Sequence, residues 1–301
     1  MEQKNQDYRK FLIPANVAGI QNLELVARLV VEGFITGLHR SPYHGFSVEF
    51  AEHRQYRHGD ETKNIDWKVY ARTNKYYVKQ YEEETNLRAV LAVDSSASMG
   101  YASKGMISKF DYAIFLTAAL SMLMLRQRDA VGLAMYDTEI RKYLPPNSKQ
   151  SYATEILKTL AAYSPTNNTG TANALDSLAE RIKRRGLVII MSDFFDEKES
   201  VLKALKHFRH RNHEVLAFHL LDPREIDFKL GTGATFRDME TGEELITQPH
   251  QIRGAYSDAV KGFIKDIKKE CFNHNIDYTM IETSTPFDKA LRDYITKRRK
   301  V

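Results

Sequence analysis

The hydrophobic pattern of the first part of the chain predicts one helix. Between Asn22 and Leu38, apolar residues recur at helical spacing and are broken by charged ones, as in an amphipathic helix. A polar, aromatic-rich segment follows over residues 41–75, and a strand is predicted over 76–81. We therefore expect residues 1–84 to form a small N-terminal part, consisting of a helix and a charged, aromatic-rich collar segment.

From residue 85 to 301, short apolar runs alternate with amphipathic stretches. The predicted strands are 88–93, 130–135, 187–191, 214–221 and 277–281, and the predicted helices are 110–125, 151–163, 172–183, 201–210, 259–272 and one from residue 286. A predicted hairpin over 235–247 interrupts the alternation. This pattern predicts an α/β fold with a doubly wound, mostly parallel sheet flanked by helices.

Composition limits the classes of protein and of site. The 301 residues are 43% hydrophobic, which is enough to bury a full core, and a net charge of +5 is too small for this length to identify a nucleic-acid binder. The single cysteine, Cys271, excludes an internal disulfide and any cysteine-built zinc site. We find no signal sequence and no apolar run of about 20 residues, so we expect a cytoplasmic protein without an integral membrane segment.

The most informative tract is Asp94-Ser95-Ser96-Ala97-Ser98, directly after the predicted strand 88–93. Ligands of open α/β sheets gather beyond the carboxyl ends of the strands. Asp94, Ser96 and Ser98 alternate along an extended turn, so one carboxylate and two hydroxyls can face a common point. Such hard oxygen donors suit Mg²⁺ or Mn²⁺. A lone tract of this kind is also common as a helix cap, so two further loops matter.

Those loops are the hydroxyl-bearing stretch 167–175 and Ser192-Asp193 at the end of the predicted strand 187–191. Here the sequence resembles the von Willebrand factor A domain, whose metal-ion-dependent adhesion site joins an Asp-x-Ser-x-Ser motif to a distant threonine and a second aspartate. The resemblance implies a Rossmann-like domain that binds Mg²⁺, or Mn²⁺ or Ca²⁺. The implied metal ligands are Asp94, Ser96, Ser98, Thr169 and Asp193. Thr171 could exchange roles with Thr169, or cap the following helix.

The chemistry of these ligands favours binding over catalysis. Two carboxylates and three hydroxyls can leave one exchangeable position on Mg²⁺, which an acidic side chain of a partner protein can fill. The neighbouring residues are mostly Ser, Ala, Asn and Gly, and the nearest possible general bases are Asp196 and Glu197. We therefore expect a metal-dependent protein-binding module that is not an enzyme.

A second group of residues surrounds the only tryptophan. It comprises Gly45, Glu49-Phe50, Arg54-Gln55-Tyr56, Gly59-Asp60, Ile65-Asp66-Trp67 and Ala71-Arg72. Mixed charges here predict a buried or half-buried ion-pair lattice, in which Arg54 and Arg72 make forked bonds to Asp60 or Asp66. The spacing resembles the short, soluble form of a bacterial family catalogued as domain of unknown function fifty-eight, although Lys63 stands where that family has arginine. Its members are often linked with MoxR-type AAA+ ATPases, which implies adaptor or co-chaperone work.

Two other functions remain open. A metal-dependent phosphohydrolase could use Asp94 as nucleophile or ligand, but enzymes of the haloacid dehalogenase type carry an aspartate two positions on, where this chain has Ser96. A nucleic-acid-binding scaffold would rest on the mild basicity alone. His207, His210 and His213 predict a solvated basic surface, because arginines are interleaved and no carboxylate accompanies them in sequence.

Overall fold

A computed structural model describes residues 10, 12–17, 20, 22–39, 53–56, 65, 67–79, 87–166, 170–228, 234–237, 244–247 and 249–298. The chain divides into two compact units. The larger unit comprises Met1–Arg40 and Leu87–Val301, and the smaller comprises Ser41–Asn86.

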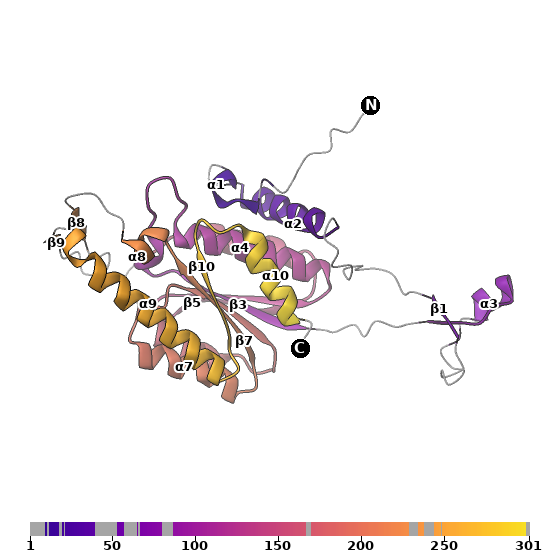
Figure 1. Ribbon diagram of the computed structural model, residues 1–301. Helices are drawn as coiled ribbons and strands as arrows, with labels where there is room; N and C mark the ends of the chain where they lie inside the picture. The colour runs from indigo at the N-terminus through magenta and orange to yellow at the C-terminus, as the bar shows by residue number, and fades with distance from the viewer. Residues whose placement is uncertain are drawn as a thin grey trace, which may run out of the picture. The chain divides into compact units, whose positions relative to one another are not determined.

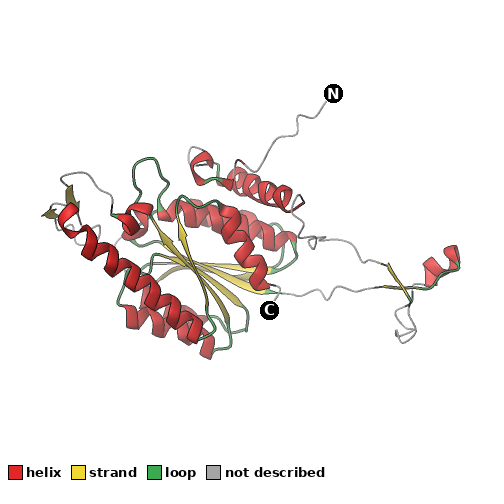
Figure 2. Cartoon of the chain, in the orientation of Figure 1, coloured by secondary structure: helices red, strands yellow, loops and turns green. Residues whose placement is uncertain are grey.

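The larger unit is built on a six-stranded sheet with strand order β10-β7-β6-β3-β4-β5 (Figures 1 and 2). The strands are β3 (Arg88–Asp94), β4 (Ala130–Tyr136), β5 (Ile140–Asn147), β6 (Leu187–Ser192), β7 (Glu214–Leu221) and β10 (Asp277–Glu282). All neighbours are parallel except β5, which pairs antiparallel with β4. The predicted α/β fold with a mostly parallel sheet is confirmed.

Helices cover both faces of this sheet (Figure 1). The helices of this unit are α1 (Pro14–Val17), α2 (Leu23–His39), α4 (Lys109–Arg126), α5 (Tyr152–Ala161), α6 (Thr171–Arg181), α7 (Lys198–His210), α8 (Pro223–Asp227), α9 (Pro249–Asn273) and α10 (Phe287–Arg298). Helices α4 and α10 pack on one face, while α6, α7 and α9 form the core of the other with alternate strand residues such as Val90, Ala92 and Ile190. Nearly all residues of β3, β4, β6 and β7 are buried, which explains why these strands read as continuous apolar runs.

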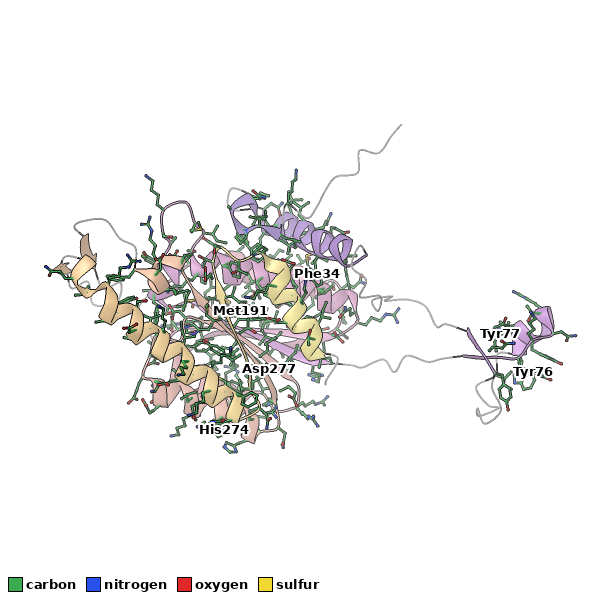
Figure 3. All side chains as sticks on the ribbon, viewed as in Figure 1. Phe34, Tyr76, Tyr77, Met191, His274 and Asp277 are labelled. Atoms are coloured by element: carbon green, nitrogen blue, oxygen red, sulfur yellow. The ribbon has the colours of Figure 1, made fainter. Side chains whose placement is uncertain are left out.

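Helix α4 is apolar on nearly all sides because two elements cover it. The sheet lies on one side of it and α2 on the other, where Phe34 is only 1% exposed (Figure 3). On the sheet side, the Thr117 hydroxyl donates to the sulfur of Met191 at 3.2 Å. Helix α2 therefore belongs to the larger unit, whereas the sequence pattern grouped it with the collar in residues 1–84.

Strand β5 was not predicted from the sequence. Leu144 is its one buried residue, and it includes Pro145 and Pro146, which fit an edge strand because proline cannot donate to a ladder. Gly132 on β4 allows the two strands to approach closely, because a Cβ atom there would lie 2.6 Å from the Leu144 carbonyl oxygen. A backbone contact between two strands produces no apolar periodicity in the sequence, so the pattern did not predict β5.

The predicted hairpin over 235–247 is present as β8 (Ala234–Arg237) and β9 (Glu244–Thr247), which pair antiparallel. Within the described part of the chain, no helix combines the length and the apolar character needed to cross a bilayer.

The smaller unit contains β1 (His53–Gln55) paired antiparallel with β2 (Tyr77–Lys79), and helix α3 (Trp67–Thr73). The rings of Tyr70 and Tyr76 stack at 4.4 Å. Trp67 is 59% exposed. The ion-pair lattice of Arg54 and Arg72 with Asp60 or Asp66 stays a prediction. The expected carboxylate partners, Asp60 and Asp66, lie outside the described residues.

Candidate metal centre

The candidate site lies at the carboxyl end of the two central strands. Strands β3 and β6 pair in parallel with Val93 opposite Met191, so the next residues, Asp94 and Ser192, meet at the same edge of the sheet. Asp94 and Asp193 are both fully buried. The turn after β3 is held by Ser95, whose backbone N–H and hydroxyl both donate to the Tyr136 carbonyl, at 2.7 and 2.9 Å.

Three groups donate hydrogen bonds to the carboxylate of Asp94. The backbone N–H of Ser96 donates to Oδ1 at 2.9 Å. The hydroxyls of Ser192 and Thr171 donate to Oδ2 at 2.6 and 3.2 Å. These bonds fix the carboxylate group in one orientation, which is what a preorganised ligand requires.

The two motif serines face each other. Ser96 Oγ and Ser98 Oγ are 3.2 Å apart, and Ser96 is fully buried. Ser96 occupies the cap position of the short 3-10 helix Ala97–Gly100 but makes no side-chain capping bond, so its hydroxyl is not needed to begin that helix. Capping therefore does not account for this serine.

Asp193 sits in a turn that follows β6. Its Oδ1 accepts from the backbone N–H of Phe195 at 3.2 Å, and its Oδ2 accepts from Lys109 Nζ at 2.8 Å. The intervening Phe194 has φ +52°, in the left-handed region, which turns the chain sharply after the aspartate. Lys109 Nζ also donates to Glu225 Oε1 at 2.5 Å.

Burial dominates the electrostatics of the site. Burial and, second, repulsion from Asp193 raise the pKa of Asp94 to about 6, although the hydrogen bonds from Ser192 and Ser96 act in the opposite direction. Burial disfavours the Lys109 ammonium, but the charges of Asp193 and Glu225 outweigh burial and raise the pKa of Lys109. Burial likewise lowers the pKa of His219, on β7, to about 4.

Hydrogen bonds thus join three predicted ligands, Asp94 to Ser96 and Ser96 to Ser98, and the fourth, Asp193, directly follows Ser192, which donates to Asp94. The fifth, Thr169, lies outside the described residues, while the alternative, Thr171, has its hydroxyl on Asp94. Sequence reasoning missed the contact of Ser192 with Asp94, although its place beside Asp193 at a strand end was a usable signal. It also missed Lys109 and Glu225, for which no local signal exists.

The donor chemistry of the site fits a hard divalent cation. Among the described residues, no three or more His, Cys, Asp or Glu side chains gather to hold a metal, so any ion here would depend on hydroxyls as well as on two carboxylates. Lys109 pairs with Asp193 and Glu225, while the buried carboxylate of Asp94 has no ion-pair partner within the described part of the chain. Buried charges usually occur paired, so this excess of carboxylates favours a further cation.

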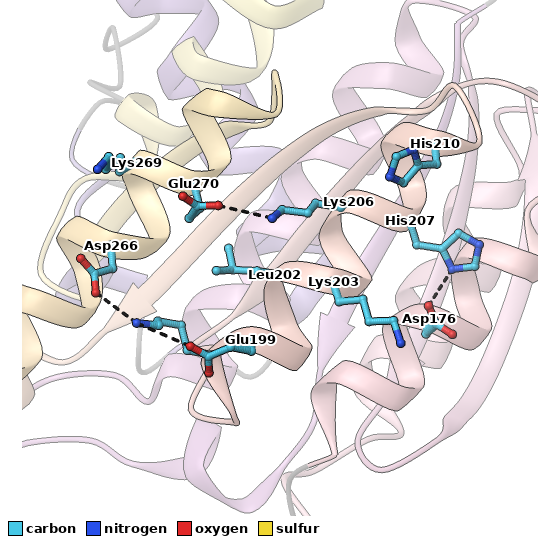
Figure 4. Close-up of a pocket in the computed structure, with 11 residues that line it drawn as sticks. Asp176, Glu199, Leu202, Lys203, Lys206, His207, His210, Asp266, Lys269 and Glu270 are labelled. Atoms are coloured by element: carbon cyan, nitrogen blue, oxygen red, sulfur yellow. Dashed lines mark hydrogen bonds and ion pairs between the residues drawn. The ribbon is translucent and has the colours of Figure 1, made fainter.

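A cavity of about 900 Å³ lies elsewhere, between α7 and α9, and none of these site residues line it (Figure 4). Ion pairs span it, including Lys206–Glu270 at 3.3 Å. The His207 ring nitrogen Nδ1 lies 2.6 Å from Asp176, and His213 is buried. The prediction of a solvated histidine surface without a carboxylate is therefore wrong for both residues.

Comparisons with known proteins place the chain among uncharacterized relatives. The family described as "Protein of unknown function DUF58" matches residues 52–263. An uncharacterized protein of Mycobacterium tuberculosis is 29% identical over 232 residues, covering 76% of this chain and 72% of its own. An uncharacterized protein of Mycobacterium avium is 26% identical over 132 residues, covering 43% of this chain and 76% of its own.

Two solved structures show a partial similarity to this chain. The conserved hypothetical protein BatB from Bacteroides thetaiotaomicron has a TM-score of 0.48 at 17% identity, covering 71% of this chain and 100% of its own. An aerotolerance-related membrane protein from Bacteroides fragilis has a TM-score of 0.48 at 19% identity, covering 70% of this chain and 99% of its own.

Proposed function

Because the chain belongs to the family of proteins of unknown function DUF58, we propose that it is a metal-dependent protein-binding module. The resemblance of its sequence to this family implies the role of an adaptor. The observation that carries the proposal is the pair of fully buried carboxylates, Asp94 and Asp193, set among hydroxyls at the carboxyl end of the sheet. Lys109 neutralises only Asp193 and Glu225, so an ionised Asp94 is unfavourable without a further cation, and a divalent ion would suit the site.

The residues that would hold the ion are Asp94, Ser96, Ser98 and Asp193, together with Thr169 or Thr171. Mg²⁺ is the ion that best matches hard oxygen donors of this number, with Mn²⁺ and Ca²⁺ as substitutes. A bound ion would supply a position that a partner's Asp or Glu side chain can fill. The chain's own task is to keep Asp94 oriented, which the bonds from Ser192 and Thr171 accomplish.

Binding rather than turnover is favoured by the state of the nearest carboxylates. Asp196 accepts from the backbone N–H of Ala172 at 3.1 Å and from that of Glu197 at 2.7 Å, so both of its oxygens are engaged in local structure. Glu197 in turn accepts from the Ser200 hydroxyl at 2.5 Å. Both carboxylates therefore have structural roles in this turn, which supports binding over turnover.

For the partner, the family resemblance favours a MoxR-type AAA+ ATPase, with the protein acting as its adaptor or co-chaperone. An acidic side chain of that partner would complete the metal site. The test is a pull-down with and without chelator, in which an AAA+ ATPase is expected to be retained only when Mg²⁺ is present. Equal retention in both conditions would remove the metal from the interaction.

The metal itself is tested by calorimetry with Mg²⁺ on the wild type and on Asp94→Ala. Asp258→Ala is the matched control, because Asp258 is an exposed aspartate on α9. We expect the wild type and the control to bind alike and Asp94→Ala to lose binding. If Asp94→Ala binds as the wild type does, the proposed metal centre is not at Asp94.

A further inference from the structure

Lys109 is a fully buried lysine inside the candidate site. It is the first residue of α4, and its ammonium lies 2.8 Å from Asp193 Oδ2 and 2.5 Å from Glu225 Oε1. The faces of two rings complete its surroundings, Phe195 at 4.9 Å and Tyr101 at 6.0 Å. One cation therefore joins a predicted metal ligand to a carboxylate that the metal motif does not include.

Local structure does not account for this position. The beginning of a helix disfavours a positive charge, because its free N–H groups already carry the positive end of the dipole. Burial of an ammonium is also unfavourable unless carboxylates pair with it. Lys109 is therefore held by Asp193 and Glu225, which lie 84 and 116 residues away in sequence.

Glu225 is itself held in place. It belongs to α8, where its Oε2 accepts from the backbone N–H of Asp222 at 2.8 Å while Oε1 faces Lys109. Asp222 completes a capping box and accepts from the backbone N–H of Ser103 at 2.8 Å. The strength of the Lys109–Glu225 contact therefore depends on the position of α8.

We propose that Lys109 is an internal counter-cation that competes with the divalent ion for Asp193, and that Glu225 weakens this competition by sharing the ammonium. The inference rests on the proposed function, because it concerns the affinity of the same metal site. Its consequence is regulatory: whatever displaces α8 shifts the ammonium toward Asp193 and lowers the affinity for metal.

Removing the charge of Lys109 and removing that of Glu225 should change the metal affinity in opposite directions. Replacing Lys109 by Met removes the positive charge beside Asp193, so the divalent ion should bind more tightly. Replacing Glu225 by Gln leaves the ammonium entirely to Asp193, so the ion should bind more weakly. Unit charges a few Å apart in a buried site interact strongly enough for changes of about tenfold or more in Kd.

The experiment is calorimetry with Mg²⁺ on the wild type, Lys109→Met, Glu225→Gln and the double variant. Tighter binding by Lys109→Met together with weaker binding by Glu225→Gln supports the proposal, since a merely structural role would weaken binding in both. In the double variant, Glu225→Gln should have little further effect, because Glu225 acts through Lys109. The double variant also buries fewer charges, which keeps the test open if one single variant fails to fold.

A second measurement needs no bound metal at the start. In chelator, Lys109→Met should melt at a lower temperature than the wild type, because Asp193 and Glu225 lose their cation. Addition of Mg²⁺ should raise its Tm by more than it raises that of the wild type. An equal or smaller rise would contradict competition at Asp193.

The two proposals fail in different ways. If neither the wild type nor Lys109→Met binds Mg²⁺ through Asp94, the proposed function is wrong. If the wild type binds through Asp94 while a folded Lys109→Met binds equally or more weakly, only the role of Lys109 is wrong.

Discussion

Replacing Asp94 by Asn should stabilise the metal-free protein at neutral pH. The carboxylate is fully buried and faces Asp193, so its ionised form is unfavourable in the native state. Asn keeps the shape of the side chain and an acceptor for the backbone N–H of Ser96 but carries no charge. The predicted gain in stability therefore depends on pH in a direction that can be worked out.

In the native protein the pKa of Asp94 is raised by burial from 3.8 to about 6. Between these values the native state holds a proton that the unfolded state has released, so stability falls as the pH rises through this window. Once the carboxyl is ionised in both states, the lost stability is about 3 kcal/mol. Well below pH 3.8, where the carboxyl is protonated in both states, the wild type loses none of it.

Urea denaturation in the presence of chelator, from about pH 3 to about pH 8, measures this effect. The free energy of unfolding of Asp94→Asn minus that of the wild type should rise by about 3 kcal/mol across the range. The exposed control Asp258→Asn should show a flat difference. Saturating Mg²⁺ should stabilise the wild type but not Asp94→Asn, which reverses their order. If the difference in free energy of unfolding between Asp94→Asn and the wild type does not change with pH, the claim that Asp94 is a buried carboxylate with a raised pKa is refuted.

The remaining predictions concern packing. Gly186→Ala would place a Cβ atom 2.3 Å from the Arg88 carbonyl oxygen and should destabilise the fold by about 1–3 kcal/mol in urea denaturation, whereas Gly262→Ala, with open space on α9, should stabilise it by up to about 1 kcal/mol. Phe34→Ala should cost about 3–5 kcal/mol by the same assay, because this 1% exposed ring docks α2 on α4. Burial raises the pKa of the Cys271 thiol to about 12, so a thiol reagent at a pH of about 8 should label it only on unfolding.

Much of the larger unit follows from local pattern. Strands such as β6, with six buried residues in a row, and helices such as α7 were predictable because covering a parallel sheet on both faces leaves continuous apolar runs separated by amphipathic stretches. The metal motif could likewise be predicted from the sequence. Asp94 and Asp193 each follow a predicted strand, and the carboxyl ends of parallel strands meet at one edge.

Only the tertiary structure decided what these residues contact. Lys109 begins a helix whose apolar sequence indicates burial, but nothing near it in sequence identifies Asp193 or Glu225 as its partners. The same holds for β5, which needs the backbone of Gly132 beside it, and for the exposure of Trp67. The hydrophobic periodicity of a helix or strand indicates which of its faces is buried. The pairing of charges depends on which distant segments meet, and that is fixed only when the sheet and its helices pack.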